Sequence, residues 1–149
     1  MAAYTYHISA QYHQDDRTCV EADHAVPRTI HFSPPPEFGG EAGFWTPEHF
    51  LLAAVGSCFV STFKGMAMVS KLELRGIEVA VEGTIEKDAG GFRFTRIVLL
   101  PIAIITEEKQ RETTQRLLEK AEKHCLVTRS LSSTTEMEAR IMVEHPVAV

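Results

Sequence analysis

The sequence lacks the signatures of several large functional classes. It has no basic stripe, and its 15 Lys and Arg residues against 20 Asp and Glu residues give a net charge of −5, which argues against nucleic acid or an anionic membrane as the main partner. No CxxC, HExxH or GxGxxG motif is present. The N-terminal stretch MAAYTYHIS has no basic segment followed by an apolar one, so nothing resembles a signal peptide and the cytoplasm is the expected location.

Cysteine is scarce as well. The three cysteines, Cys19, Cys58 and Cys125, are an odd number in a chain with no export signal, so a structural disulfide framework is not expected and any pairing among them indicates redox chemistry. No set of metal ligands stands at a zinc-like spacing, because His124 beside Cys125 has no third or fourth partner. The 149 residues suit a single domain, 1–149, with one core.

The stretch from Trp45 to Leu72 dominates what is present, and it predicts a long central helix. Thr46 is a candidate N-cap, Pro47 suits the first helical position, and Glu48 places an acid at the positive end of the helix dipole. Cys58 lies at the middle of this helix. The helix is therefore the element that would carry a reactive thiol.

The apolar residues of this helix project in every direction, which predicts that it is covered on all sides. A membrane span is the rival explanation, but Gly56, Ser57, Ser61, Thr62 and Lys64 interrupt the run before the roughly 20 apolar residues that a bilayer requires, so a core helix is favoured. Small residues would also let another helix approach closely: Ala53, Ala54, Gly56, Gly65 and Ala67. A buried core helix in a dimer is the expectation.

Strand periodicity marks both flanks of the helix, so the predicted class is α+β. Before the helix, residues 3–12, 17–23 (RTCVEAD) and 28–33 are expected to form an antiparallel meander, followed by an irregular Pro/Gly loop. After it, residues 76–105 alternate as a β-hairpin with an irregularity expected near Pro101. A last strand is expected at about 134–144.

A second helix is predicted between the hairpin and the last strand. Thr106 is its expected cap, with acids in the first turn and bases in the last, an order that matches the helix dipole. Leu117, Leu118 and Ala121 recur at helical spacing, and Cys125 lies one turn further along the same stripe. The second cysteine is therefore expected to point inward.

These motifs together resemble the OsmC/Ohr family of thiol peroxidases. The likeness rests on the helix PEHFLLAAVGSCF, the loop ending in PEFGG and the segment HCLVTRSL. The resemblance implies two antiparallel sheets that enclose two long helices, and an intertwined homodimer. It also implies that Cys58 is the peroxidatic thiol, that Cys125 resolves it, and that Glu48 and an arginine of an early strand activate it. Arg17 matches that arginine, with Arg28 as the alternative.

The residues fit this chemistry in their own right. A thiol attacks a peroxide as thiolate and becomes a sulfenic acid, which a second thiol converts to a disulfide, so two cysteines are the minimum set. A buried thiol needs a cation to ionise, and an arginine fork could hold both the thiolate and the Glu48 carboxylate. Apolar walls would favour organic hydroperoxides, and the expected wall residues are Phe44, Trp45, Phe59 and Phe63. No metal or flavin cofactor is expected, and the resemblance suggests a lipoyl-type dithiol as reductant.

One departure from the family keeps a second function open. The family usually has proline after its second cysteine, whereas this chain has Leu126. A non-catalytic dimer of the same fold that binds a small hydrophobic ligand is the alternative. In that case Cys58 would be an inert core residue, Glu48 only a first-turn acid and Arg17 a solvated strand charge. Cys19, two residues after Arg17, is expected to be a strand cysteine or a spare thiol.

The spacing of Glu48 and Cys58 predicts a site shared between two chains. Ten residues on a straight helix separate the two by about 15 Å along the axis and by about 80° around it, too far for one side chain to reach across. Either the helix breaks between them or Glu48 acts on the thiol of the other chain across a two-fold axis. Because Gly56 alone is a weak helix breaker, the second arrangement is the expectation.

Overall fold

The computed structural model describes residues 3, 8–13, 17–22 and 28–145. The chain forms two compact units, Met1–Leu51 and Leu52–Val149, and each is described here by itself. The division falls inside the first long helix, α1 (Pro47–Val69). That residues 1–149 act as one domain stays a prediction.

The first unit contains the expected antiparallel meander. Strand β1 (Ile8–His13) pairs with β2 (Arg17–Ala22), which pairs with β3 (Ile30–His31). The predicted start of the first strand, residues 4–7, lies outside the described residues. β3 is shorter than expected, because Phe32 instead forms an isolated bridge with Trp45 and Ser33 donates its N–H to the Trp45 carbonyl at 2.9 Å. The following loop is irregular apart from one short 3₁₀ turn, η1 (Pro36–Phe38).

Helix α1 begins where the sequence predicts. The Thr46 hydroxyl accepts the backbone N–H of His49 at 3.2 Å, and His49 Nδ1 accepts the backbone N–H of Thr46 at 3.1 Å. This reciprocal pair is a capping box in which histidine takes the place of the usual glutamate. The helix then runs unbroken through Gly56 to Val69, so the possibility of a break between Glu48 and Cys58 is wrong.

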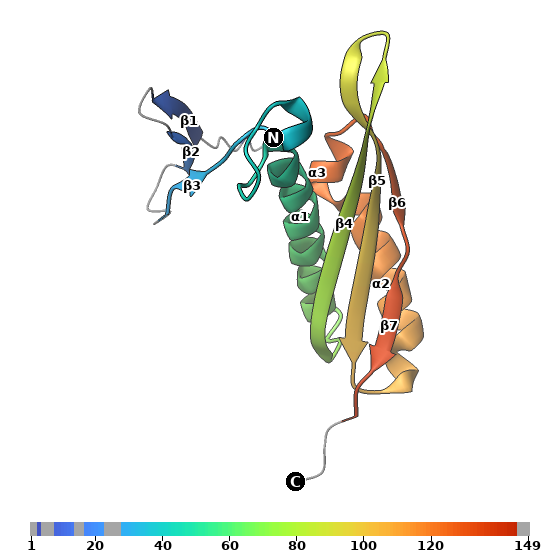
Figure 1. Ribbon diagram of the computed structural model, residues 1–149. Coiled ribbons are helices and arrows are strands. Elements are labelled where there is room, and N and C mark those ends of the chain that lie inside the picture. The colour runs from blue at the N-terminus through green and yellow to red at the C-terminus, as the bar shows by residue number, and fades with distance from the viewer. Residues whose placement is uncertain (1–2, 4–7, 14–16, 23–27, 146–149) are drawn as a thin grey trace. The chain divides into compact units, whose positions relative to one another are not determined.

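The second unit is built on the predicted hairpin, β4 (Leu74–Asp88) and β5 (Gly91–Ile105). The expected last strand is split into β6 (Thr134–Met137) and β7 (Arg140–Val143), and both pair with β5 in the parallel direction. This sheet is therefore mixed, which corrects the expectation of two wholly antiparallel sheets. Figure 1 shows β6 and β7 along the side of β5 opposite to β4.

The irregularity expected near Pro101 lies not in β5 but in the strand beside it that is divided into β6 and β7. Pro101 pairs in register with Val79, and the bulges of the hairpin occur between Leu74 and Gly76 and between Thr84 and Ile85. The Leu99 carbonyl accepts the Glu138 N–H at 2.9 Å, so Leu99 and Pro101, two residues apart, direct their backbone groups toward the same neighbour. Because proline has no N–H to give, that neighbour is interrupted where β6 ends and β7 begins.

The second helix starts later than expected. A 3₁₀ turn, η2 (Glu108–Gln110), precedes α2 (Arg111–His124), and the capping box is made by Glu107 and Gln110, so the prediction that Thr106 is the cap is wrong. The Thr106 hydroxyl instead donates to Gln110 Oε1 at 3.2 Å. A third helix of four residues, α3 (Leu126–Arg129), follows directly after Cys125.

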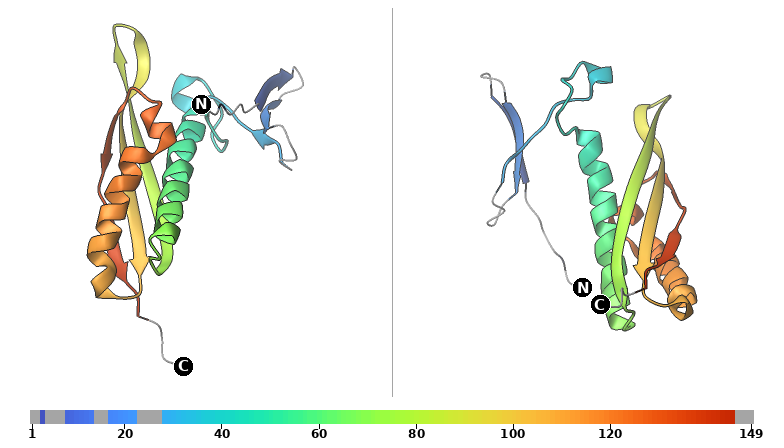
Figure 2. Two further views of the ribbon diagram at one scale, coloured as in Figure 1. Left: turned by 180° about the vertical axis from the view of Figure 1, so that it is seen from behind. Right: turned by 60° about the horizontal axis from the view of Figure 1, so that its bottom comes forward.

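Helices α1 and α2 pack on one face of the second sheet, as Figures 1 and 2 show. Their buried side chains join those of β5 in one core: Val55, Phe59 and Phe63; Leu117, Leu118 and Ala121; Ile97, Leu99 and Ala103. Gly56 packs toward the sheet, because a Cβ there would lie 3.1 Å from Val81, and Ala67 is buried too. Gly56 therefore faces the sheet and Ala67 is covered within its own chain, so neither serves the approach of another helix.

The opposite face of α1 is open in the single chain. The exposed positions follow one another at helical spacing: Ala53, Ser57, Ser61, Lys64, Gly65 and Met68. By length and composition alone α1 could cross a membrane, a criterion that the core helix of a soluble protein also meets. Here its inner face is occupied by the packed core described above.

The hairpin contains one close approach that can be tested by mutation. A Cβ added at Gly83 would lie 2.6 Å from the ring of Phe94 and 2.8 Å from Leu52. Gly83→Ala should therefore destabilise the protein by about 1–3 kcal/mol, measured as a lower midpoint of urea unfolding. Gly76→Ala is the matched control, because its nearest neighbour, Ile104, would be 3.9 Å away. Equal midpoints for the two variants would show that the packing around Gly83 yields freely.

Candidate active site

The two predicted thiols lie together in the second unit. Cys58, in the middle of α1, is half-buried, and Cys125, between the end of α2 and the start of α3, is fully buried with no exposed surface. The Cys125 side chain lies within hydrogen-bonding range of the Cys58 sulfur and is one of the groups that lower the pKa of the Cys58 thiol. The prediction that Cys125 points inward is confirmed, and the two sulfurs are in reach of each other.

The surroundings of Cys58 lower the pKa of its thiol below the ordinary value. Burial acts first and raises the pKa, but hydrogen bonds to the sulfur from the Val127 N–H, the Cys125 thiol, the Leu126 N–H and the Thr62 hydroxyl together outweigh it. All of these groups are neutral donors. The thiolate is thus stabilised by directed dipoles, with no cation among the described groups that lower its pKa.

The two backbone donors are free to serve Cys58 because of how α3 begins. The first N–H groups of a helix have no partner inside it, and no side chain caps α3. The Thr128 hydroxyl, which could have capped the turn, donates to the Cys125 carbonyl at 3.1 Å instead, as does the Arg129 N–H at 3.1 Å. The sulfur of Cys58 takes the place of a cap.

Sequence reasoning missed these donors. Thr62 could have been found, because it lies four residues after Cys58 and therefore on the same face of the helix. The N–H groups of Leu126 and Val127 carry no signal in the sequence, since any residue other than proline offers one. Leu126 had been noted only as a departure from the family pattern, and its side chain is 70% exposed.

Glu48 and the arginines are only partly placed. Glu48 lies in the first turn of α1, and its Oε2 atom is buried with no hydrogen-bond partner among the described residues. Arg17 begins β2 opposite His13, but its side chain lies outside what the structure describes, and the side chain of Cys19 does too. Arg28, the alternative, is exposed. A buried carboxylate oxygen without a donor is costly, so Glu48 calls for a partner.

The predicted aromatic wall is divided between two environments. Phe44 and Trp45, both about half exposed, line a cavity of about 300 Å³ with Gly43 and His49 in the first unit. Trp45 also stacks on Phe50 with ring centroids 5.7 Å apart. Phe59 and Phe63, by contrast, have no exposed surface and lie in the core of the second unit.

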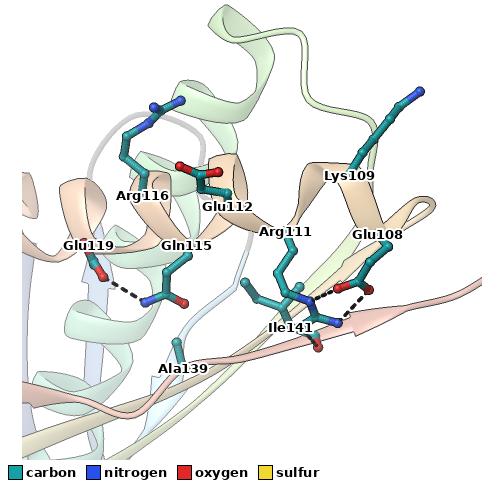
Figure 3. Close-up of a pocket in the computed structure, with 9 residues that line it drawn as sticks. All are labelled: Glu108, Lys109, Arg111, Glu112, Gln115, Arg116, Glu119, Ala139 and Ile141. Atoms are coloured by element: carbon teal, nitrogen blue, oxygen red, sulfur yellow. Dashed lines mark hydrogen bonds and ion pairs between the residues drawn. The ribbon is translucent and has the colours of Figure 1, made fainter.

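A larger cavity, of about 720 Å³, lies between α2 and β7 (Figure 3). Arg111 crosses it, donating to the Ile141 carbonyl at 3.1 Å and pairing with Glu108, and Gln115 bonds Glu119 at 2.9 Å. Its lining holds no cysteine, and Arg111 and Glu108 form an ion pair within it. Within the described residues, no group of three or more His, Cys, Asp or Glu side chains could hold a metal ion.

Comparisons with known proteins agree on the fold. Residues 39–140 match the family model described as "OsmC-like protein". The uncharacterised protein YmaD of Bacillus subtilis is 22% identical over 149 residues, 97% of each chain. An OsmC-like protein of unknown function from Vibrio cholerae superposes with a TM-score of 0.80 at 17% identity, covering 92% of this chain and 99% of the other. An organic hydroperoxide resistance protein from Legionella pneumophila gives 0.74 at 24% identity, covering 96% and 100%.

Proposed function

Because the chain belongs to the OsmC-like protein family, we propose that it is a cysteine-based peroxidase that reduces organic hydroperoxides. The observation that carries the proposal is the pair of thiols. Cys58 is partly open to solvent and its thiol has a lowered pKa, while the fully buried Cys125 lies within hydrogen-bonding range of it. A nucleophilic thiolate with a second thiol held against it is the minimum set for a disulfide-forming peroxidase.

The reaction runs in two steps on this pair. The Cys58 thiolate attacks the outer peroxide oxygen, the O–O bond breaks, and the alcohol leaves after taking a proton, which produces Cys58 sulfenic acid. The Cys125 sulfur then attacks the Cys58 sulfur, water leaves, and a Cys58–Cys125 disulfide forms. A dithiol, lipoyl-type by family resemblance, reduces this disulfide to restore both thiols, with no cofactor held by the protein.

The orphaned oxygen of Glu48 supports the role given to an arginine. A guanidinium carries several donors in one plane, so it can satisfy Glu48 Oε2 and still hold a thiolate. Arg17, with Arg28 as the alternative, is the proposed partner. The neutral donors around Cys58 already favour its thiolate, so the arginine would add to their effect and also orient the peroxide.

The apolar character of the site suits an organic substrate. Phe44 and Trp45 offer exposed aromatic surface beside a small cavity in the first unit, while Phe59 and Phe63 belong to the apolar core of the second unit, against which Cys58 packs. Burial of apolar surface contributes affinity in proportion to area, which favours an alkyl or aryl hydroperoxide over hydrogen peroxide. The reducing cytoplasm is the proposed location.

The open face of α1 supports an intertwined homodimer. Its exposed residues are mostly small, with Ala53, Ser57 and Gly65 on one stripe, so the helix of a second chain could approach closely. Such contact would complete the covering of an apolar helix that the single chain leaves half open. A monodisperse monomer in sedimentation velocity would contradict this arrangement.

Counting free thiols tests the proposed function directly. Cumene hydroperoxide should remove two free thiols per chain from the reduced wild type and only one from Cys125→Ser, because that variant stops at the sulfenic acid. If peroxide consumes no thiols, the peroxidase proposal fails. The alternative, a non-catalytic dimer that holds a small hydrophobic ligand beside Phe44 and Trp45, would then be favoured.

A further inference from the structure

The two sulfurs of the proposed disulfide differ in accessibility. Cys125 has no exposed surface, and its backbone carbonyl is fixed by hydrogen bonds from the Thr128 hydroxyl and the Arg129 N–H, both 3.1 Å long. Cys58 is only half-buried. Because the Cys125 side chain already lies within hydrogen-bonding range of Cys58, the two sulfurs can close to the S–S length of about 2 Å while Cys125 stays in the core.

We infer that the Cys58–Cys125 disulfide is opened at the Cys58 sulfur, so that the reductant becomes joined to Cys58 and Cys125 is the leaving group. This inference rests on the proposed function, which requires a disulfide and a dithiol. Thiol–disulfide exchange is an in-line displacement, so the attacking sulfur must approach Cys58 from the side opposite to Cys125. A peroxide must reach Cys58 through the same opening, whereas nothing in the reaction requires Cys125 to be reached from outside.

The exchange balances in two steps. The first thiolate of the dithiol bonds to Cys58 Sγ, the Cys58–Cys125 bond breaks, and its electron pair goes to Cys125 Sγ, which takes up a proton. The second thiolate of the dithiol then attacks its own sulfur in the mixed disulfide and expels the Cys58 thiolate. The dithiol is oxidised to a disulfide, and the protein regains both thiols.

Leaving-group chemistry alone would favour attack at Cys125, but the poor accessibility of Cys125 opposes such an attack. The thiol of lower pKa leaves faster, so attack on Cys125 would profit from expelling Cys58. That preference is less than tenfold for each unit of pKa. Attack on Cys125 also requires the packed core around it to open first. The rate of that attack is therefore reduced in proportion to the small population of the open state. When the reductant attacks Cys58 instead, the Cys58 thiolate is the leaving group of the second step, in which the mixed disulfide is resolved and the enzyme is released.

The experiment maps where a monothiol becomes attached. A Cys19→Ser background removes the third thiol, and diamide in place of peroxide forms the disulfide, so that the result does not depend on peroxidase activity. Brief exposure to 2-mercaptoethanol is quenched with excess N-ethylmaleimide in denaturant, so that buried thiols are also labelled, and the peptides are analysed by mass spectrometry. Mercaptoethanol is expected on Cys58 and maleimide on Cys125. Mercaptoethanol on Cys125, or on both residues in comparable amounts, would overturn the inference.

A second measurement tests access without exchange. In the same background, reduced Cys125→Ser should react with N-ethylmaleimide at Cys58 at least tenfold faster than reduced Cys58→Ser reacts at Cys125, with circular dichroism confirming that both variants are folded. Equal rates would also overturn the inference. Failure of diamide to form the disulfide would overturn both the pairing and the inference, whereas failure with peroxide alone would refute only the peroxidase proposal.

Discussion

Replacing Leu126 by proline should raise the pKa of the Cys58 thiol and slow its reaction with peroxide at neutral pH by roughly three- to tenfold. The substitution removes one of the backbone N–H groups that donate to the Cys58 sulfur. A hydrogen bond to a charged group is worth about one to two pKa units, and each unit costs roughly threefold in rate once the higher nucleophilicity of the more basic thiolate is included.

The protein should accept this proline without unfolding. Leu126 is the first residue of α3, a position where helices tolerate proline. The preceding Cys125 has φ −61° and ψ 114°, the extended conformation that a residue before proline prefers. Leu126→Ala is the matched control, because it removes the 70% exposed side chain and keeps the N–H. If both variants alkylate at Cys58 with the same pH profile, the Leu126 N–H does not stabilise the thiolate.

The same substitution has a defined effect on the pH dependence of stability. The pKa of Cys58 is lower in the folded protein than in the unfolded chain. The thiolate therefore contributes stability that is fully present above the unfolded pKa of about 8.5 and is lost as the pH falls through the folded pKa. Leu126→Pro should lower the free energy of unfolding of the reduced protein more at about pH 9 than at about pH 5. A loss of equal size at both values would point to backbone strain.

The elements that carry the thiols could be predicted because their signals are local. Thr46, Pro47 and Glu48 mark a helix start that depends on backbone hydrogen bonding within a few residues, and α1 begins at Pro47. The position of Cys125 followed from a repeat of 3.6 residues that continues through α2. Burial of Cys125 and its proximity to Cys58 agree with that reading.

The parts that could not be predicted depend on contacts distant in sequence. The interruption between β6 and β7 lies beside Pro101, which has no N–H to donate to the neighbouring strand. This relation can be recognised only when the parallel pairing of β6 and β7 with β5 is known. α2 starts late because the Gln110 side chain hydrogen-bonds back to Glu107 and Thr106. Gln110 therefore takes part in the cap in place of the Thr106 hydroxyl, which the sequence had favoured as the capping group. The two backbone donors to Cys58 come from the four-residue helix α3, which is too short to show a helical repeat in the sequence.

The unbroken course of α1 sharpens the question of how Glu48 acts. Glu48 and Cys58 lie on one continuous helix, ten positions apart, so about 15 Å along the axis separates their backbone positions in the same chain. If one arginine touches both groups, we expect it to bring together Cys58 of one chain and Glu48 of another. In a two-fold dimer this produces two equivalent composite sites.

Subunit mixing should reveal these composite sites. Cys58→Ser and Glu48→Ala homodimers are each expected to be inactive, and equal mixing should produce heterodimers with one intact site, made of Cys58 from one chain and Glu48 from the other. With random exchange, half of the dimers are mixed and about a quarter of wild-type turnover should return. Exchange is verified by native mass spectrometry, and turnover is measured with cumene hydroperoxide and a dithiol.

A reciprocal mixture separates the shared site from one contained within a chain. When wild type is mixed with the Cys58→Ser, Glu48→Ala double variant, each heterodimer of the shared arrangement lacks either the thiol or the carboxylate at both sites, so wild-type turnover should fall to about half. If Glu48 acts within its own chain, the wild-type subunit stays active in every heterodimer and turnover does not change. The shared site therefore predicts a gain of turnover in the first mixture and a loss in the second. No gain in the first and no loss in the second would show that Glu48 acts within its own chain.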